Sequence, residues 1–140
     1  MQLLHPKNWT QTRGFSNGVA AEGRQVFVAG QVGWNARQEI VDDDFVAQVE
    51  QALRNVVDVL AEASARPEDL VRLTWYVTDK REYLARSSEV GQAYRRVIGL
   101  HFPAMTLVQV VALVEDRAKV EIEATAVVPK SQLSSLKAEV

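Results

Sequence analysis

Strand-like and helix-like segments alternate along this chain of 140 residues. Five stretches have the short apolar runs or the two-residue alternation of strands: residues 14–21, 25–31, 71–78, 104–113 and 120–128. Two stretches between them carry apolar residues at helical spacing, one ending before Pro67 and the other at Gly99. The order ββ-α-β-α-ββ therefore predicts an α+β fold, with one mixed sheet and two helices packed on one face.

Turn and cap residues support these boundaries. Glu22-Gly23 is a hairpin signal, so we expect the first two strands to pair with each other. Asp42-Asp43-Asp44 supplies an N-cap for the first helix, which spans about five turns at 3.6 residues each. Asp79 leads into the second helix.

One domain is expected, at residues 14–129. Residues 1–13 are polar and are interrupted by His5-Pro6, which predicts an irregular N-terminal arm. Residues 130–140 read as a polar C-terminal tail. A chain of this length can bury a core without disulfides or metal ions.

Several function classes conflict with the composition. The absence of cysteine excludes disulfide scaffolds, thiol nucleophiles and cysteine-based zinc sites. The two histidines, His5 and His101, argue against a metal centre, and the net charge of −2 argues against a nucleic-acid partner. No apolar run approaches the roughly 18 residues of a membrane span, and the N-terminus lacks a signal-peptide pattern. We therefore expect a cytoplasmic protein without membrane or nucleic-acid partners.

The sheet face opposite the helices is expected to be mixed in polarity. Its predicted members are Thr74, Tyr76, Thr106, Val108, Val110, Ala112, Glu121, Glu123 and Thr125. This face is too apolar for full exposure and too polar for a core, which favours self-association.

Glu121 and Glu123 lie two residues apart on one strand, so both side chains leave the same face. The ordinary interpretation is that each carboxylate meets an arginine, such as Arg72 or Arg37, or faces water. The alternative is that one of them acts as a general base on a bound water.

Five short sequences, taken together and in this order, resemble the Rid family (reactive intermediate deaminases, or YjgF family). They are Val28-Ala29-Gly30-Gln31, Gln51-Ala52-Leu53-Arg54-Asn55-Val56, Tyr76-Val77-Thr78-Asp79, Phe102-Pro103-Ala104 and Val120-Glu121-Ile122-Glu123-Ala124. The resemblance implies a chorismate-mutase-like fold and a homotrimer whose sheets line a central barrel. It also implies small-molecule clefts between subunits and the hydrolysis of enamines or imines, such as 2-aminoacrylate, without a cofactor.

The resemblance assigns roles to two residues that match the family pattern. Glu121 matches the carboxylate that positions or activates the attacking water. Gly30 matches a backbone position whose N–H can hold a ligand oxygen. Beside it, Ala29 stands where a serine is common.

Other members of the implied cleft depart from the family pattern. Phe15 stands where a tyrosine is frequent, so the ring remains but the hydroxyl is lost. Ser88, or its neighbour Ser87, falls near a position often held by asparagine. Leu107 replaces a residue that is often cysteine.

Met105 is the largest departure. In the deaminating branch of the family an arginine follows Phe-Pro-Ala and grips the substrate carboxylate with two parallel hydrogen bonds. At about 1.5–3 kcal/mol for each bond, the loss of this pair weakens binding by roughly two to four orders of magnitude. Activity on 2-aminoacrylate and on imines of ordinary amino acids is therefore expected to be poor or absent.

The remaining cleft would be more apolar. Met105, Leu107, Phe15 and Trp34 are its expected lining, which suits a less polar enamine or imine. Arg13, Arg37 and Arg86 are candidates for a replacement cation. For Trp34 and Trp75 the ordinary interpretation is core or interface packing, and His101 is expected to be a loop or interface residue rather than a catalyst.

Two functions remain open. One is a deaminase or related hydrolase with an altered substrate, favoured by the retention of Glu121. The other is a non-catalytic small-molecule-binding trimer, favoured by the loss of the arginine, the serine and the tyrosine hydroxyl. Ribonuclease activity has also been attached to the family, but this chain has no histidine pair and no basic groove to support it.

Overall fold

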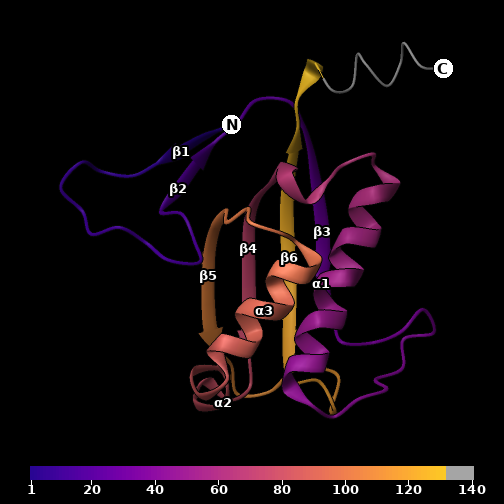
Figure 1. Cartoon of the computed structure of the whole chain (residues 1–140). Helices are drawn as coiled ribbons and strands as arrows, with labels where there is room; N and C mark the ends of the chain where they lie inside the picture. The colour runs from indigo at the N-terminus through magenta and orange to yellow at the C-terminus, as the bar shows by residue number, and fades with distance from the viewer. Residues whose placement is uncertain (132–140) are drawn as a thin grey trace.

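The computed structural model describes residues 1–131 and shows an α+β fold (Figure 1). Its main sheet has the strand order β3-β6-β4-β5. The strands are β3 (Arg24–Val32), β4 (Leu70–Val77), β5 (Ala104–Gln109) and β6 (Val120–Val128). β6 runs antiparallel to β3 and β4, whereas β4 and β5 are parallel. The predicted mixed sheet is confirmed.

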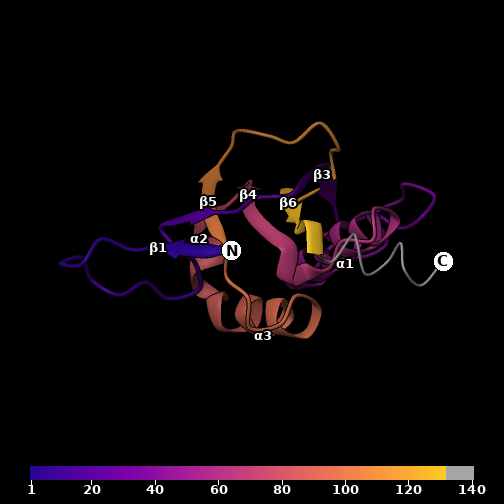
Figure 2. The ribbon, with the colours of Figure 1, turned by 90° about the horizontal axis from the view of Figure 1, so that it is seen from above.

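The helices α1 (Phe45–Glu62) and α3 (Ser87–Val97) lie on the same face of this sheet (Figure 2). α1 follows Asp44, whose carboxylate accepts a hydrogen bond of 3.0 Å from the backbone N–H of Ala47. Most of its apolar stripe, including Leu53 and Leu60, is buried. The helix boundaries predicted from the aspartate run and the apolar spacing are confirmed.

The single second helix that the sequence predicts is in fact two helices. α2 (Lys80–Ala85) begins after Asp79, and α3 begins at Ser87. Between them Arg86 has φ −115° and ψ 24°, which interrupts the helical path. Gly99 has φ +99°, the left-handed conformation that commonly ends a helix at a glycine. A short 3-10 helix, η1 (Pro67–Asp69), precedes β4.

The predicted hairpin between the first two strands is wrong. β2 (Gly18–Ala20) pairs with β1 (Gln2–Leu4), and β3 pairs with β6. At Gly23, with φ +148°, a Cβ would stand 2.1 Å from the backbone oxygen of Val128. The chain thus passes close along the end of β6 instead of reversing into a hairpin. The N-terminal arm, predicted to be irregular, therefore contains a strand, β1.

The last two strands differ in how well the sequence predicts them. β6 has the predicted bounds, but β5 ends at Gln109 rather than at residue 113. The loop at residues 110–119 leaves Val111 and Val114 fully exposed. The predicted polar tail lies outside the described residues from residue 132 onward. Within residues 1–131, no helix combines the length and the apolar character needed to cross a membrane.

Candidate functional site

A cavity of about 550 Å³ lies beside β5 and α3, next to the loop that precedes β2. Its lining is mainly apolar or aromatic and includes Phe15, Trp75, Tyr94, Phe102, Met105 and Leu107. Small-molecule sites are commonly concave, mostly apolar and about 300–1,000 Å³ in volume. The cavity therefore has the size and the character of a small-molecule site.

The parallel pairing of β4 and β5 directs two of these side chains. Met105 lies opposite Leu73 and Leu107 lies opposite Trp75. Leu73 and Trp75 are buried beneath the helices, and neighbouring positions in a sheet share a face. Met105 and Leu107 accordingly pack against the same core. Thr106, between them, is exposed.

Three aromatic rings stack along the cavity wall. The Tyr94 ring centroid lies 6.4 Å from that of Trp75 and 5.3 Å from that of Phe102. The Tyr94 hydroxyl donates a hydrogen bond of 2.5 Å to the backbone oxygen of His101, and burial raises the pKa of Tyr94. The His101 ring nitrogen Nε2 lies 2.7 Å from the backbone oxygen of Leu70, so this histidine has a structural contact.

Phe15 reaches the cavity because the loop that carries it is bound to the start of β5. The backbone N–H of Ser16 donates to Pro103 at 3.0 Å, and the Ser16 hydroxyl donates to the backbone oxygen of Phe102 at 2.6 Å. Ser16 also forms an isolated parallel bridge with Ala104. These bonds hold Phe15 on the same cavity as Met105.

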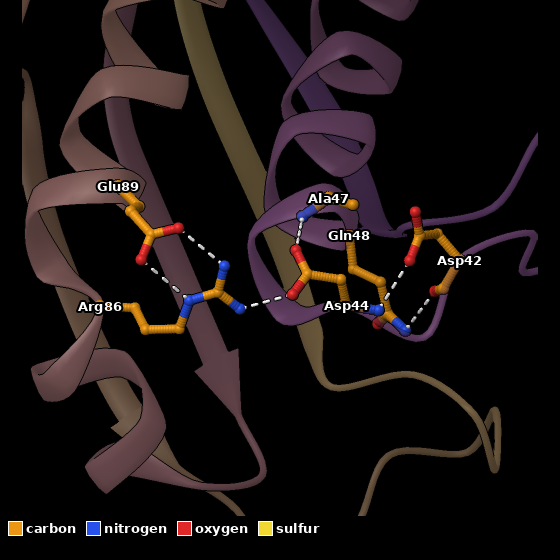
Figure 3. Close-up of polar contacts among 6 residues, drawn as sticks. All are labelled: Asp42, Asp44, Ala47, Gln48, Arg86 and Glu89. Atoms are coloured by element: carbon orange, nitrogen blue, oxygen red, sulfur yellow. Dashed lines mark hydrogen bonds and ion pairs between the residues drawn. The ribbon is translucent and has the colours of Figure 1, made fainter.

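Ser87, and not the predicted Ser88, lines the cavity. Arg86, directly before it, donates to Asp44 at 2.5 Å and to Glu89 at 2.7 Å and 3.2 Å (Figure 3). The hydrogen bonds from Arg86 hold the pKa values of Asp44 and Glu89 below their usual range. This network ties the start of α3 to the start of α1. It also occupies Arg86, which does not line the cavity as a replacement cation.

A second group of predicted site residues lies at a bulge in β3. Val28 pairs with Ala124 and Gln31 pairs with Ile122, so Ala29 and Gly30 together lie opposite Glu123. Bulges of this kind bend a strand and redirect nearby side chains. A Cβ on Gly30 would stand 2.8 Å from the carboxyl carbon of Glu121. The Glu121 side chain therefore rests against a backbone position that only glycine leaves open.

Glu121 and Glu123 lie on the sheet face away from the helices, as predicted. Glu121 is half-buried and lies opposite Tyr76 of β4. Glu123 is exposed and accepts a hydrogen bond of 2.8 Å from the Tyr76 hydroxyl, which raises the pKa of Tyr76. Neither carboxylate forms an ion pair within residues 1–131 of its own chain, so the suggested arginine partners are not found within one chain.

Within one chain the predicted site residues fall into two separate groups. Phe15, Met105 and Leu107 lie at the β5 edge, on the helix side. Gly30 and Glu121 lie at the β3–β6 side, with Glu121 on the open face. β3 and β5 are opposite edges of the sheet, about 14 Å apart at three strand spacings of about 4.8 Å. The sheet itself also lies between the helix side and the open face, so the two groups do not form one site within a single chain.

Other candidate residues lie elsewhere or were missed. Trp34 packs near Val32 and Ile40 rather than lining the cavity. Arg13 lines the cavity, as does Arg95, which the sequence did not suggest. No cluster of His, Asp or Glu side chains suitable for a metal ion occurs in the part of the chain that the structure describes.

Comparisons with known proteins agree on the family. The model of the family described as endoribonuclease L-PSP matches residues 7–128. A RutC family protein from Haemophilus influenzae is 33% identical over 105 residues, which cover 75% of this chain and 80% of that protein. The 2-iminobutanoate/2-iminopropanoate deaminase of Escherichia coli K12 is 32% identical over 105 residues, with the same two coverages of 75% and 80%. The Rid-family protein YyfB from Yersinia pestis, of unknown function, superposes with a TM-score of 0.81 at 35% identity, over 91% of this chain and 98% of that one.

Proposed function

The chain belongs to the Rid family, and on that premise we propose that it hydrolyses a small enamine or imine at a site formed between copies of the chain in a homotrimer. The observation that carries the proposal is the position of Glu121 against Gly30, without an ion-pair partner within residues 1–131. A carboxylate that is not neutralised by a cation remains available as a base.

Assembly would unite the two groups of site residues. The group around the cavity lies at one edge of the sheet, and the group at the bulge lies at the other edge. When the β3 side of one copy adjoins the β5 side of the next, the Glu121 carboxylate of one chain approaches the cavity of its neighbour. The exposed Phe27 and Val108 on the open sheet face support such association, since exposed apolar surface favours contact between copies.

The proposed reaction is the hydrolysis of a carbon–nitrogen double bond. Water adds to the imine carbon while the Glu121 carboxylate accepts its proton. The protonated carboxyl returns this proton to the nitrogen, which gives a carbinolamine. The Glu121 carboxylate then takes the hydroxyl proton of the carbinolamine and passes it to the nitrogen, and the C–N bond breaks to give a carbonyl compound and ammonia. An enamine would first take a proton at carbon to become the imine. Neither step uses a cofactor.

The lining of the cavity sets the expected substrate range. Met105 has no hydrogen-bond donor and no charge, so it cannot grip the carboxylate of a short 2-imino acid. The compounds named for the E. coli relative, 2-iminobutanoate and 2-iminopropanoate, are therefore expected to be poor substrates for this chain. Enamines or imines with a larger apolar body suit the cavity better.

The experiment that tests the proposal compares Glu121→Gln with Glu123→Gln. Both changes remove one carboxylate from the same strand, but only Glu121 contacts the bulge. Imines generated in situ by an amino-acid oxidase from amino acids of increasing side-chain size would be followed by their rate of loss. We expect Glu121→Gln to lower kcat/KM by about 10²–10⁴-fold, the usual range for a general base, and Glu123→Gln to leave it nearly unchanged.

A non-catalytic small-molecule-binding trimer is the second candidate. The side chains at Met105, Phe15 and Ala29 favour it, because each lacks a polar group that the family pattern supplies. If no imine or enamine shows turnover that depends on Glu121 while ligands still bind to the cavity, this second function replaces the first.

A further inference from the structure

We propose that the cavity beside β5 binds an organic anion with a flat apolar body, whose anionic group is held by Arg13 and Arg95. The inference rests on the proposed function, since it names the ligand class and the cation for the same cleft. It assigns to Arg13 and Arg95 the role that Met105 cannot perform.

The first observation is the positive charge of the cavity lining. Arg13 and Arg95 are the charged residues among those that line it, and no acidic side chain of the described residues does so. This local charge is opposite in sign to the net charge of −2 of the whole chain. Two guanidinium groups beside an apolar cavity favour an anionic ligand, because charge-assisted bonds to carboxylates are the strong ones.

The second observation is the position of the Arg95 side chain on α3. Its guanidinium nitrogens Nη1 and Nη2 lie 3.5 Å and 3.9 Å from the point where a Cβ on Gly91 would stand. Residues four apart lie on the same side of a helix, so the Arg95 side chain folds back along α3 over Gly91. Gly91 itself lines the cavity. The Arg95 residue is exposed, and its guanidinium lies beside the cavity, where a ligand can reach it.

The third observation is that Arg13 and Arg95 have no ion-pair partner within residues 1–131. The adjacent Arg96, in contrast, donates to Glu50 at 2.9 Å. Arg86, at the start of the same helix, is bound to Asp44 and Glu89. The cavity arginines therefore keep their hydrogen-bond donors available for a ligand, while the other two serve the fold.

The inner wall indicates the shape of the rest of the ligand. Phe102, Leu107 and the stacked ring of Tyr94 suit a flat ring. Trp75 is only 4% exposed, and its indole Nε1–H has no hydrogen-bond partner in residues 1–131. Because Nε1 is hidden from water, a side chain must shift before a ligand reaches this atom. A carbonyl or imine acceptor on the ligand would then satisfy this donor.

The experiment uses 3-phenylpropanoate, its neutral amide and propanoate as probes, titrated by calorimetry into the full-length protein. We expect 3-phenylpropanoate to bind at least about tenfold more tightly than either of the others, a difference of about 1.4 kcal/mol. Arg95→Gln and Arg13→Gln should each weaken its binding by about tenfold or more. Arg96→Gln is the matched control and should change the Kd by less than about twofold.

A second readout follows the indole N–H resonance of Trp75, assigned by its loss in Trp75→Phe. It should shift on addition of phenylpyruvate, which carries a carbonyl acceptor. Equal binding of the acid and the amide, no detectable binding of the acid, or unchanged affinity in both Arg13→Gln and Arg95→Gln would overturn the inference. Circular dichroism of each variant checks that it is folded.

The two proposals fail in different ways. Glu121→Gln should lower kcat/KM by about 10²–10⁴-fold, as expected for a general base, but leave 3-phenylpropanoate binding intact. If turnover depends on Glu121 but the binding of 3-phenylpropanoate does not depend on Arg13 or Arg95, only the present inference is contradicted. If 3-phenylpropanoate binding depends on the two arginines but no turnover depends on Glu121, only the enzymatic function is contradicted.

Discussion

The carboxyl carbon of Glu121 lies 2.8 Å from the point where a Cβ on Gly30 would stand, and its Oε1 lies 2.9 Å from it. The contact joins β6 to the bulge in β3. A carbon at this point would displace the end of a flexible side chain and leave the backbone in place. Function and stability should therefore respond differently to a substitution at Gly30.

We predict that Gly30→Ala lowers turnover about as much as Glu121→Gln does, because it moves the carboxylate. Its effect on the free energy of unfolding should stay below about 1 kcal/mol, the range of substitutions that disturb no packed core. Steady-state kinetics and urea unfolding measure the two effects. In a Glu121→Ala background, Gly30→Ala should have no further effect on turnover.

Gly33→Ala is the matched control for this prediction. There the Cβ would stand 2.7 Å from the Cα of Gln48, which belongs to the backbone of α1. Because a helix backbone cannot move aside as a side chain can, we expect destabilisation of about 1–3 kcal/mol, typical of overpacking. A Gly33→Ala protein as stable as Gly30→Ala would contradict the distinction between the two glycines.

Gln48 joins α1 to two loops, and its loss should destabilise the fold. The side chain is 1% exposed. Its Nε2 donates to the backbone oxygens of Asp42 at 2.9 Å and Arg117 at 3.1 Å, and its Oε1 accepts from the N–H of Lys119 at 2.8 Å; the first of these bonds is drawn in Figure 3.

Gln48→Leu would leave these buried backbone groups unpaired, at a cost of about 1–3 kcal/mol for each group that water cannot reach. We therefore expect urea unfolding to show a loss of at least about 2 kcal/mol. The exposed Gln92→Leu serves as the control and should change the stability by less than about 0.5 kcal/mol.

The Arg86 network should make stability depend on pH. Its hydrogen bonds lower the pKa values of Asp44 and Glu89 in the folded protein. A group with a lower pKa in the folded than in the unfolded state stabilises the fold above its unfolded pKa, and this stabilisation is lost as the pH falls through the folded pKa.

The difference in Tm between the wild type and Arg86→Gln should accordingly be largest near neutral pH and should shrink below about pH 4, where carboxylates of ordinary pKa take up protons. Both carboxylates are largely exposed, so we expect a small effect. Thermal unfolding between pH 7 and pH 3 measures it. Arg81→Gln, outside this network, should show no such pH dependence; a constant Tm difference for Arg86→Gln would contradict the prediction.

Met105→Arg should restore the recognition of short 2-imino acids. An arginine here adds two charge-assisted hydrogen bonds to a substrate carboxylate, which corresponds to a gain in kcat/KM of roughly 10²–10⁴-fold on 2-aminoacrylate. Met105→Leu keeps the apolar volume and should not raise this activity. Efficient turnover of 2-aminoacrylate by the unmodified chain would show that Met105 is no obstacle.

The sequence predicted best the elements with one buried face. α1 and β6 each pack one side against the core, so their apolar residues repeat with the period of the element. β1 and β2 contain no buried residue, so burial leaves no comparable pattern, and their pairing was missed. The end of β5 was missed because the half-buried Val110 and the exposed Val111 continue its apolar run into the loop.

The cavity could be predicted only in part. Resemblance identified Phe15, Met105 and Leu107, which the fold brings to one wall. The contributions of Trp75 and Tyr94 depend on how α3 crosses β4 and β5, and no local pattern encodes that crossing. The one sequence feature that could have pointed to Arg95 is its i, i+4 spacing from Gly91. That spacing is common in helices that bind no ligand, so it does not predict a site.

The separation of the two groups of site residues on opposite edges of the sheet has a genetic consequence. If each working site takes one half from each of two chains, two inactive variants can complement one another. We expect some activity to return when a chain altered only at Glu121 is refolded together with a chain altered only at the cavity. In mixed oligomers, some sites then combine the intact cavity of the first chain with the intact Glu121 of the second. Damage to both halves of one chain could not be rescued in this way by a second copy with the same double defect.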